Sequence, residues 1–430
     1  MNNKFVYQGE KLYSSAIYYY GSVPGKVQNT FRIILKLDED ICKDSLRSAL
    51  DKCQERYPYL MVKIKKSIKE LSLVYNDLPF TITHTKDTVT LGTEETNYHF
   101  LALSFYDQSL VLTVFHGLVD GRAAIEFLKT LLYYYVMEKY HETPASEGVR
   151  LAEDEIAPEE YTDPMTTINI DDSLKSLITG KEDETLFRIE KADKRITKGR
   201  QYNYRVKVPQ SSLMNYCRTN DASPATLFSL LIARAAKRLN PETTDSIIGG
   251  LARDLRPALH APKSHYSNVG MIFWTFDEKI QRLTFEKQNT SIRGRIILKN
   301  DEDTVKSGIR SSKQFYEFVR KLPFVWLKKA LLKKLIVLNL GRQTFAVSYV
   351  GKSSFGSAEK HIREMYTDAD CPGTNIMLEV NAINDAFFLS FVQEWKERLY
   401  FDAFCKEMET IGLDYEIMGE GDFAVADAKI

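Results

Sequence analysis

Two short runs of alternating apolar and polar residues, followed by a run with helical spacing, dominate the first third of the chain. Residues 99–106 and 109–115 alternate on either side of Asp107-Gln108, which predicts a β-hairpin. After Gly121 the apolar residues recur at helical spacing through Val136. We therefore expect the second strand to lead through a sharp turn into an amphipathic helix.

Helix and strand patterns also precede this hairpin. Residues 43–57 place apolar side chains on one helical face, and Pro58 is expected to end that helix. Residues 60–65 alternate as a strand, and residues 71–75 form another. Together with the hairpin and a helix to about Tyr140, these segments predict a first lobe of mixed helices and strands.

The segment 141–200 has a different composition. Pro144, Pro158 and Pro164 interrupt it, and acidic residues are concentrated between positions 153 and 160. Such punctuation is typical of a long crossover connection with short strands or turns. We interpret the acidic run as a solvated linker.

The second half of the chain returns to regular elements. Residues 201–208 alternate as a strand, and Ser223-Pro224 predicts a helix start because serine caps and proline suits the first turn. Further strands are expected at residues 247–251, 272–276, 343–350, 375–383 and 387–392, and a helix at residues 400–411. The pattern predicts an α+β fold of two lobes, residues 1–160 and 161–430, with the boundary inside the crossover.

Composition narrows the classes of function. The 430-residue chain carries 58 Lys and Arg and 58 Asp and Glu, and this zero net charge argues against general nucleic-acid binding. Its 5 cysteines form no Cys-x-x-Cys pair and no metal-ligand spacing, which is typical of free thiols in a reducing cytosol. The sequence opens on no signal-peptide core and contains no apolar run of about 18 residues. We therefore expect a cytoplasmic monomer without a membrane span or a metal.

His116 is the clearest candidate for chemistry, because it stands between the end of the predicted hairpin and the start of the helix. Asp120 falls at the N-cap position of that helix, and Gly121 has the backbone freedom that a tight turn into the helix requires. A histidine aimed by a turn that an aspartate stiffens can act as a general base. The alternative is an ordinary loop histidine beside a capping aspartate, and spacing alone does not separate the two.

Two other motifs fail on spacing. Gly351-Lys352-Ser353 resembles the end of a phosphate-binding loop, but Ala346 stands where the leading glycine is required. His260 and His265 lie in a proline-containing loop with no third ligand nearby, so we do not expect a zinc site.

Residues 322–340 combine a broad apolar stripe with a polar face made of lysines. These are Lys328, Lys329, Lys333 and Lys334. A helix of this kind can lie on an anionic membrane surface. We favour the alternative, an amphipathic helix packed on the second lobe with solvated or snorkelling lysines, so membrane contact is the less favoured interpretation.

His116, Asp120 and Gly121 have the spacing His-x-x-x-Asp-Gly, which resembles the signature of the acyl-CoA-dependent acyltransferase superfamily. That group includes chloramphenicol acetyltransferase, the alcohol acetyltransferases, plant acyltransferases and the condensation domains of nonribosomal peptide synthetases. Condensation domains usually have a second histidine just before the catalytic one, and here that residue is Phe115. The resemblance is therefore closer to the alcohol acetyltransferase branch.

Two later parts of the sequence resemble the same family. Residues 254–257 (Asp-Leu-Arg-Pro) and 267–270 (Ser-Asn-Val-Gly) are similar to its second block, and residues 348–351 (Ser-Tyr-Val-Gly) to its third. The blocks span most of the chain in order. The resemblance implies two chloramphenicol acetyltransferase-like lobes that form a pseudo-dimer, with the active site in a tunnel between them.

The resemblance also implies a mechanism. His116 would take a proton from an alcohol or amine as that group attacks the thioester of acyl-CoA, a co-substrate, with no permanently bound cofactor and no acyl-enzyme. Asp120 would support the loop through an ion pair with an arginine of the second lobe. Arg256 is the first candidate for this arginine and Arg253 the second.

Other residues in the matched blocks are candidates for substrate contacts. Ser348 or Tyr349 is the candidate donor to the oxyanion. Gly121, Asn268 and Arg256 complete the expected substrate-binding set.

Two alternatives stay open. The acyl donor could be a carrier-protein thioester, although Phe115 and the lack of an attached carrier region count against it. The chain could also be a noncatalytic relative that binds a ligand or a partner. The presence of His116, Asp120 and Gly121 together argues against loss of the catalytic motif.

Overall fold

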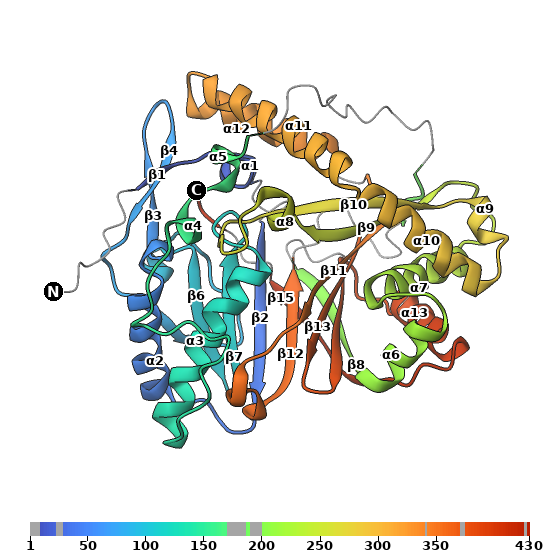
Figure 1. Cartoon of the computed structure of the whole chain (residues 1–430), viewed down its shortest axis with the longest axis horizontal. Helices are drawn as coiled ribbons and strands as arrows, with labels where there is room; N and C mark the ends of the chain where they lie inside the picture. The colour runs from blue at the N-terminus through green and yellow to red at the C-terminus, as the bar shows by residue number, and fades with distance from the viewer. Residues whose placement is uncertain are drawn as a thin grey trace.

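Two lobes, each built on its own β-sheet, form the molecule (Figure 1). The computed structural model describes residues 9–22, 29–169, 186–189, 200–339, 342–369, 375–424 and 428–430. Within these residues a five-stranded sheet forms the centre of the first lobe and a seven-stranded sheet that of the second. The predicted α+β class with two lobes is confirmed.

The first-lobe sheet has the strand order β12-β2-β7-β6-β5. Its strands are β2 (Thr30–Leu37), β5 (Ile82–His84), β6 (Leu101–Tyr106), β7 (Ser109–Phe115) and β12 (Ile362–Ala369). The antiparallel pair β6–β7 is the predicted hairpin around Asp107-Gln108. Helices α2 (Lys43–Arg56) and α3 (Gly121–Tyr140) pack against each other and bury their apolar stripes in the core of this lobe.

Strand β12 ties the two halves of the sequence together. It pairs antiparallel with β2 at the edge of the first-lobe sheet, as the orange and blue strands in Figure 1 show. Asp368 of β12 lies 2.6 Å from Nη2 of Arg32. It accepts hydrogen bonds from Asn203 of β8 (Arg200–Pro209) and Ser390 of β14 (Ala386–Gln393). Residues of both sheets therefore meet around one buried carboxylate.

The second-lobe sheet has the order β10-β9-β11-β13-β14-β8-β15. Its strands are β8 (Arg200–Pro209), β9 (Ile247–Asp254), β10 (Val269–Phe276), β11 (Phe345–Lys352), β13 (Ile376–Ile383), β14 (Ala386–Gln393) and β15 (Glu416–Ala424). Helices α6 (Gln210–Thr219), α7 (Pro224–Leu239), α10 (Phe285–Lys299) and α13 (Leu399–Thr410) lie on its outer side. Helix α7 begins as predicted, because Oγ of Ser223 accepts a hydrogen bond from the backbone N of Thr226.

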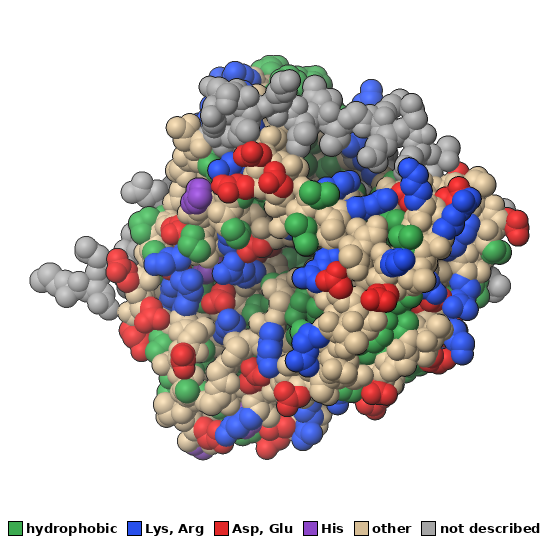
Figure 2. Space-filling view, turned by 45° about the vertical axis from the view of Figure 1, so that its right-hand side comes forward, with side chains coloured by type: hydrophobic (Ala, Val, Ile, Leu, Met, Phe, Trp, Pro, Cys, Tyr) green, Lys and Arg blue, Asp and Glu red, His purple; other side chains and the backbone are tan. Residues whose placement is uncertain are grey.

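Shorter elements and two long helices complete the described chain. They are β1 (Glu10–Lys11), α1 (Ala16–Gly21), β3 (Val62–Lys66), β4 (Leu71–Tyr75), α4 (Pro158–Tyr161), α5 (Pro164–Thr167), α8 (Arg256–Leu259), α9 (Glu278–Gln281), α11 (Glu302–Lys321) and α12 (Val325–Asn339). None of the described helices combines the length and the apolar character that crossing a membrane requires. Lys and Arg are interspersed with Asp and Glu over the face of the molecule in Figure 2.

The lysine-rich helix α12 packs on the first lobe, whereas we expected it on the second. Leu332 belongs to the first-lobe core, and α12 contacts α1. Lys328 is buried with its ammonium group over the ring of Tyr20, because a lysine stem can cover apolar surface while its charge faces an aromatic ring. Nζ of Lys329 donates to the backbone oxygen of Ile430. Lys328 and Lys329, two of the four lysines, therefore make contacts within the protein.

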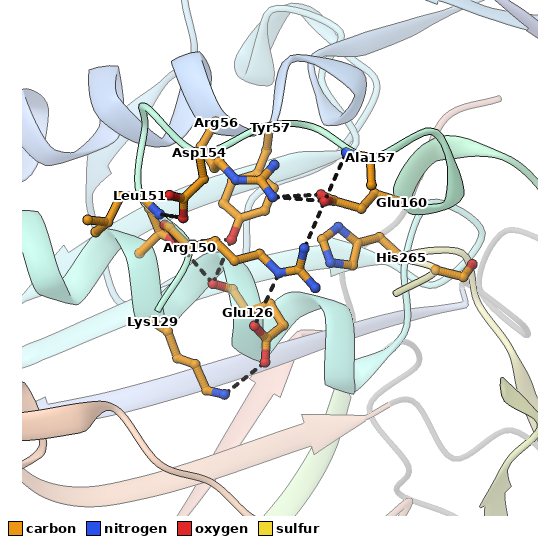
Figure 3. A network of polar contacts seen from close by, with 12 residues as sticks. Arg56, Tyr57, Glu126, Lys129, Arg150, Leu151, Asp154, Ala157, Glu160 and His265 are labelled. Carbon is orange, nitrogen blue, oxygen red and sulfur yellow. Dashed lines mark hydrogen bonds and ion pairs between the residues drawn. The ribbon is translucent and has the colours of Figure 1, made fainter. Parts of the chain in front are cut away.

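Glu160 of α4 is the centre of a buried network in the crossover segment (Figure 3). Nη2 of Arg56 donates to both carboxylate oxygens, at 2.9 and 2.8 Å, and Nη1 of Arg150 lies 2.8 Å away. Oη of Tyr59 donates to the same carboxylate and lies 2.6 Å from Nδ1 of His265. The interpretation of the acidic run as a solvated linker is therefore wrong at its last residue, whose charge is compensated by two arginines.

We expect Glu160→Gln to destabilise the protein by about 3–5 kcal/mol, the usual cost of leaving a buried charge unpaired. The amide keeps the shape of the side chain but no longer compensates Arg56 and Arg150. Urea unfolding measures the change. The exposed Glu155 of the same run provides the control, since Glu155→Gln should change stability by no more than about 0.5 kcal/mol. Equal effects of the two substitutions would show that the network does not anchor the crossover.

Candidate active site

A cavity of about 350 Å³ lies between the two lobes. The first lobe contributes His116, directly after β7, together with Phe31 of β2. The second lobe contributes Ser348 of β11 and Glu379 of β13. The sequence-predicted residues Asp120, Gly121, Arg256 and Tyr349 also line this cavity. Blocks that are far apart in the sequence therefore meet at one place.

A second cavity, of about 230 Å³, lies on the other side of the shared wall formed by Arg253, Val269 and Met271. Tyr18 and Ser267 line it, and both contact the ring of His116. His116 thus faces one cavity and touches the lining of the other. This arrangement could bring two substrates to one side chain from different directions.

The imidazole of His116 is held between aromatic rings. Tyr18 stacks on it at 5.3 Å between ring centroids with an interplanar angle of 4°, and Phe31 meets it edge-on at 5.2 Å. The backbone N of His116 donates to the oxygen of Asn29 at 2.7 Å. Burial among these groups lowers the pKa of His116 from its usual 6.5, because the charged ring is poorly solvated there. The ring is therefore neutral at pH 7 and can accept a proton.

Ser267 lies against Nδ1 of His116. Its Oγ is 3.0 Å from Nδ1 and donates its single hydrogen to Oη of Tyr18 at 3.3 Å. We infer that Oγ accepts a hydrogen bond from Nδ1–H, a tautomer that carries its lone pair on Nε2. The ring also forms a hydrogen bond with the backbone of His116 itself. No side chain of the described residues bonds to Nε2.

Asp120 does not point toward a substrate; it joins the lobes. It is 1% exposed, and its Oδ1 caps α3 by accepting from the backbone N of Ala123 at 3.1 Å. The other contacts come from the second lobe, where the backbone N of Asn268 donates to Oδ2 and Nη2 of Arg256 lies 2.8 Å away. One carboxylate therefore fixes the start of α3 against α8 and the loop between α8 and β10.

Arg256, the first candidate, is the observed partner of Asp120. The guanidinium also bonds to Oδ1 of Asp254 and to the backbone oxygens of Ser264 and Tyr266, so each of its three nitrogens donates within the protein. Arg253, the second candidate, makes no contact with Asp120; its Nη1 donates to the oxygen of Lys299. Although Arg256 lines the cavity, its guanidinium is therefore occupied by contacts with Asp120, Asp254 and the backbone of the loop.

The remaining predicted residues lie near His116 but differ in exposure. Ser348 and Tyr349 are partly exposed in the cavity wall, and Gly121 lies at the start of α3. Asn268 is 3% exposed, and its amide bonds to Oγ of Ser264 and to the oxygen of Tyr266. Its side chain therefore shapes the loop that carries Ser267.

Sequence reasoning missed three contributors to this site. Tyr18 lies in a run of tyrosines that gave no positional signal, and the role of Ser267 depends on a contact between the lobes. Glu379 interrupts an otherwise apolar strand, and such a lone acidic residue was a signal that could have been used.

The described residues supply no other obvious reactive centre. They contain no cluster of His, Cys, Asp and Glu that could hold a metal ion. His265 is bonded to Tyr59, and burial together with nearby arginines holds the pKa of its ring well below the usual value. None of the cysteines in these residues lines the cavity with His116.

Comparison with known proteins gives the fold. No family model matches the chain, and no curated protein matches its sequence. Polyketide synthase associated protein 5 from Mycobacterium tuberculosis superposes with a TM-score of 0.59 and 13% identity, over 96% of this chain and 99% of that one. The epimerization domain from the third module of tyrocidine synthetase B gives 0.61 and 12%, over 95% and 98%.

A third structure carries ligands. TRI101 of F. graminearum, complexed with coenzyme A and T-2 mycotoxin, superposes with a TM-score of 0.58 and 13% identity, over 95% of this chain and 100% of that one. The chain has the chloramphenicol acetyltransferase-like fold. The likeness shows the fold, so the reaction has to be argued from the site.

In this chloramphenicol acetyltransferase-like fold we expect Asp120 and Arg256 to be energetically coupled across the lobe interface. Asp120→Asn and Arg256→Ala should each lower stability and activity, and the double variant should fall short of additivity by about 0.5–3 kcal/mol in unfolding free energy. Urea unfolding of all four proteins measures the coupling.

Arg253 supplies the matched control, because it lies three residues before Arg256, near the end of β9, and does not bond to Asp120. Asp120→Asn combined with Arg253→Ala should be additive to within about 0.5 kcal/mol. Strict additivity for Arg256, or coupling of equal size for Arg253, would contradict the assignment.

Proposed function

We propose that this protein transfers an acyl group from acyl-CoA to an alcohol or amine, with His116 as general base and without an acyl-enzyme. The observation that carries this proposal is the geometry of His116. Its Nδ1 lies against Ser267, no side chain of the described residues bonds to its Nε2, and the residue lines a cavity between two lobes. A neutral, oriented histidine of this kind is suited to removing a proton from a hydroxyl or amine.

The two cavities support a reaction with two substrates. A thioester and an acceptor can approach His116 at the same time if they enter from different sides, and the structure of TRI101 contains both coenzyme A and a small-molecule toxin. We infer that acyl-CoA is a co-substrate here and that no cofactor is permanently bound. The acceptor is a small molecule, because the space beside His116 is only about 350 Å³.

The proposed reaction begins at Nε2 of His116, which carries the lone pair in the inferred tautomer. Nε2 takes the proton of the acceptor as its oxygen or nitrogen attacks the thioester carbonyl. The resulting oxyanion needs a hydrogen-bond donor, and the candidate is Ser348 or Tyr349, which both line the same cavity as His116. When the carbon–sulfur bond breaks, the leaving thiolate recovers the proton from the imidazolium. Asp120 keeps the loop in place and takes no part in proton transfer.

Transfer from a carrier-protein thioester is the second candidate, since the epimerization domain of tyrocidine synthetase B shares the fold. The structure offers one observation against it. Phe115, at the position of the additional histidine of condensation domains, is fully buried against Tyr19 and Phe100. That position supplies no group to the cavity.

A panel of acyl-CoAs with pooled alcohols and amines tests the proposal, with release of free thiol as the readout. With an active pair, initial-rate plots should intersect, because both substrates must be bound before the acyl group moves. His116→Ala should lower kcat by about 10²–10⁴-fold while the affinity for acyl-CoA changes little. The rate should rise with pH through a pKa below 6.5, since only the neutral ring is a base, and the Ala variant should lose that rise.

His84→Ala is the control, because His84 is exposed and lies outside both cavities. It should keep parent activity. Near-parent turnover of His116→Ala, or parallel-line kinetics with an acyl group trapped on Ser348, would contradict the mechanism. Turnover with an acylated carrier protein but not with acyl-CoA would favour the second candidate.

A further inference from the structure

Glu379 is a buried acid in the wall of the cavity that contains His116. It is 6% exposed and lies in β13, whose neighbours along the strand are almost all apolar. The parallel register of β11 and β13 places Ser348 opposite Glu379, and both residues line the same cavity. A carboxyl group is therefore the cross-strand neighbour of a candidate oxyanion donor, whose hydroxyl is close enough to lower the pKa of Glu379.

The surroundings of Glu379 contain no cation to balance a charge. No Lys or Arg of the described residues forms an ion pair with it. The charged group that faces it from β12 is Asp368, which is itself bound by Arg32 of β2 and Arg205 of β8. Across β14, the side chain of Ser390 also bonds to Asp368.

Two of the three arginines in the cavity lining are paired with carboxylates. Arg256 is paired with Asp120 and Asp254, and Arg122 with Asp254. Arg253 also lines the cavity, but its Nη1 donates to the backbone oxygen of Lys299. Burial raises the pKa of Glu379 to about 8; the contact with Ser348 lowers it, and the negative charge of Asp368 adds a smaller increase. At neutral pH the side chain is mostly a neutral carboxylic acid.

The protonation state of Glu379 decides where the single hydrogen of the Ser348 hydroxyl points. A neutral carboxyl group can donate to Oγ of Ser348, which leaves the serine hydrogen free to point into the cavity. A carboxylate can only accept, so it draws that hydrogen away from the cavity. An oxyanion beside His116 would find a donor in the first case and not in the second.

We propose that Glu379, in its neutral form, is a positioning residue that holds Ser348 as the oxyanion donor of this enzyme. The inference rests on the proposed acyl transfer, and it favours Ser348 over Tyr349 in that role. Glu379 keeps its proton throughout the cycle and acts only through Ser348. Ionisation of Glu379 turns the donor away and lowers turnover.

The test is the pH dependence of kcat with an alcohol acceptor, compared between the parent and Glu379→Gln. The parent should lose activity above pH of about 8, approaching about tenfold per pH unit, because one ionisation removes the donor. Glutamine donates to Ser348 through its amide and does not titrate. The Gln variant should therefore keep activity within about threefold of the parent at pH 7 and lack the alkaline decline.

Two further variants separate positioning from a general structural role. Ser348→Ala should lower kcat, leave the KM for acyl-CoA nearly unchanged and also lose the alkaline decline. Glu364→Gln should keep the alkaline decline. Glu364 of β12 is partly buried, but it pairs with Lys36 and lies outside the cavity.

An unchanged alkaline decline in Glu379→Gln would overturn the inference while leaving the acyltransferase proposal intact. A folded Gln variant with turnover reduced more than tenfold at pH 7 would also overturn it. Infrared difference spectra supply a readout without turnover, since the band of a protonated carboxyl group should disappear as the pH rises through about 8 and be absent from Glu379→Gln. Absence of that band would refute the neutral form directly. Failure of every donor and acceptor pair would overturn both proposals.

Discussion

The ion pair between Asp120 and Arg256 is the contact on which the rest of the site depends. Both side chains are almost fully buried, and they belong to different lobes. Asp120 also caps α3, so the turn that carries His116, the first turn of the helix and the loop after β9 are fixed by one carboxylate. A buried pair of this kind adds little net stability over an apolar contact, but it is costly to break. Its value here is geometric, because it sets the relative position of the two surfaces that line the cavity with His116.

The same loop of the second lobe is held from another side. His265 bonds to Tyr59, which bonds to Glu160, and the backbone N of His265 donates to the oxygen of Glu160. Ser267 follows His265 by two residues in the same loop, and its Oγ lies 3.0 Å from Nδ1 of His116. Two buried carboxylates therefore hold this loop, and the loop places a hydroxyl group against the ring of His116.

Much of this arrangement could be predicted from local patterns. The hairpin at residues 99–115 was predictable, because its alternation and its turn both depend on residues close together in the sequence. The start of the helix at Asp120 was predictable for the same reason, because capping involves only a few neighbouring residues. The pairing of Asp120 with Arg256 required the family resemblance. Strand β12 escaped prediction because its partner β2 lies more than three hundred residues away, as the pairing of Asp368 with Arg32 shows. Glu160 was misjudged because the acids at the start of its run are exposed, whereas one of its partners, Arg56, is 104 residues away in the sequence. The packing side of α12 depends on the position of α1.

The central claim is that acyl transfer takes place beside His116, between the lobes. A crystal structure of the protein with coenzyme A tests this most directly, because the position of one sulfur atom decides it. The account predicts that the thiol of the pantetheine arm ends in the cavity lined by His116 and Ser348, within hydrogen-bond reach of Nε2. A thiol that ends elsewhere, or coenzyme A bound at a surface remote from His116, would contradict it.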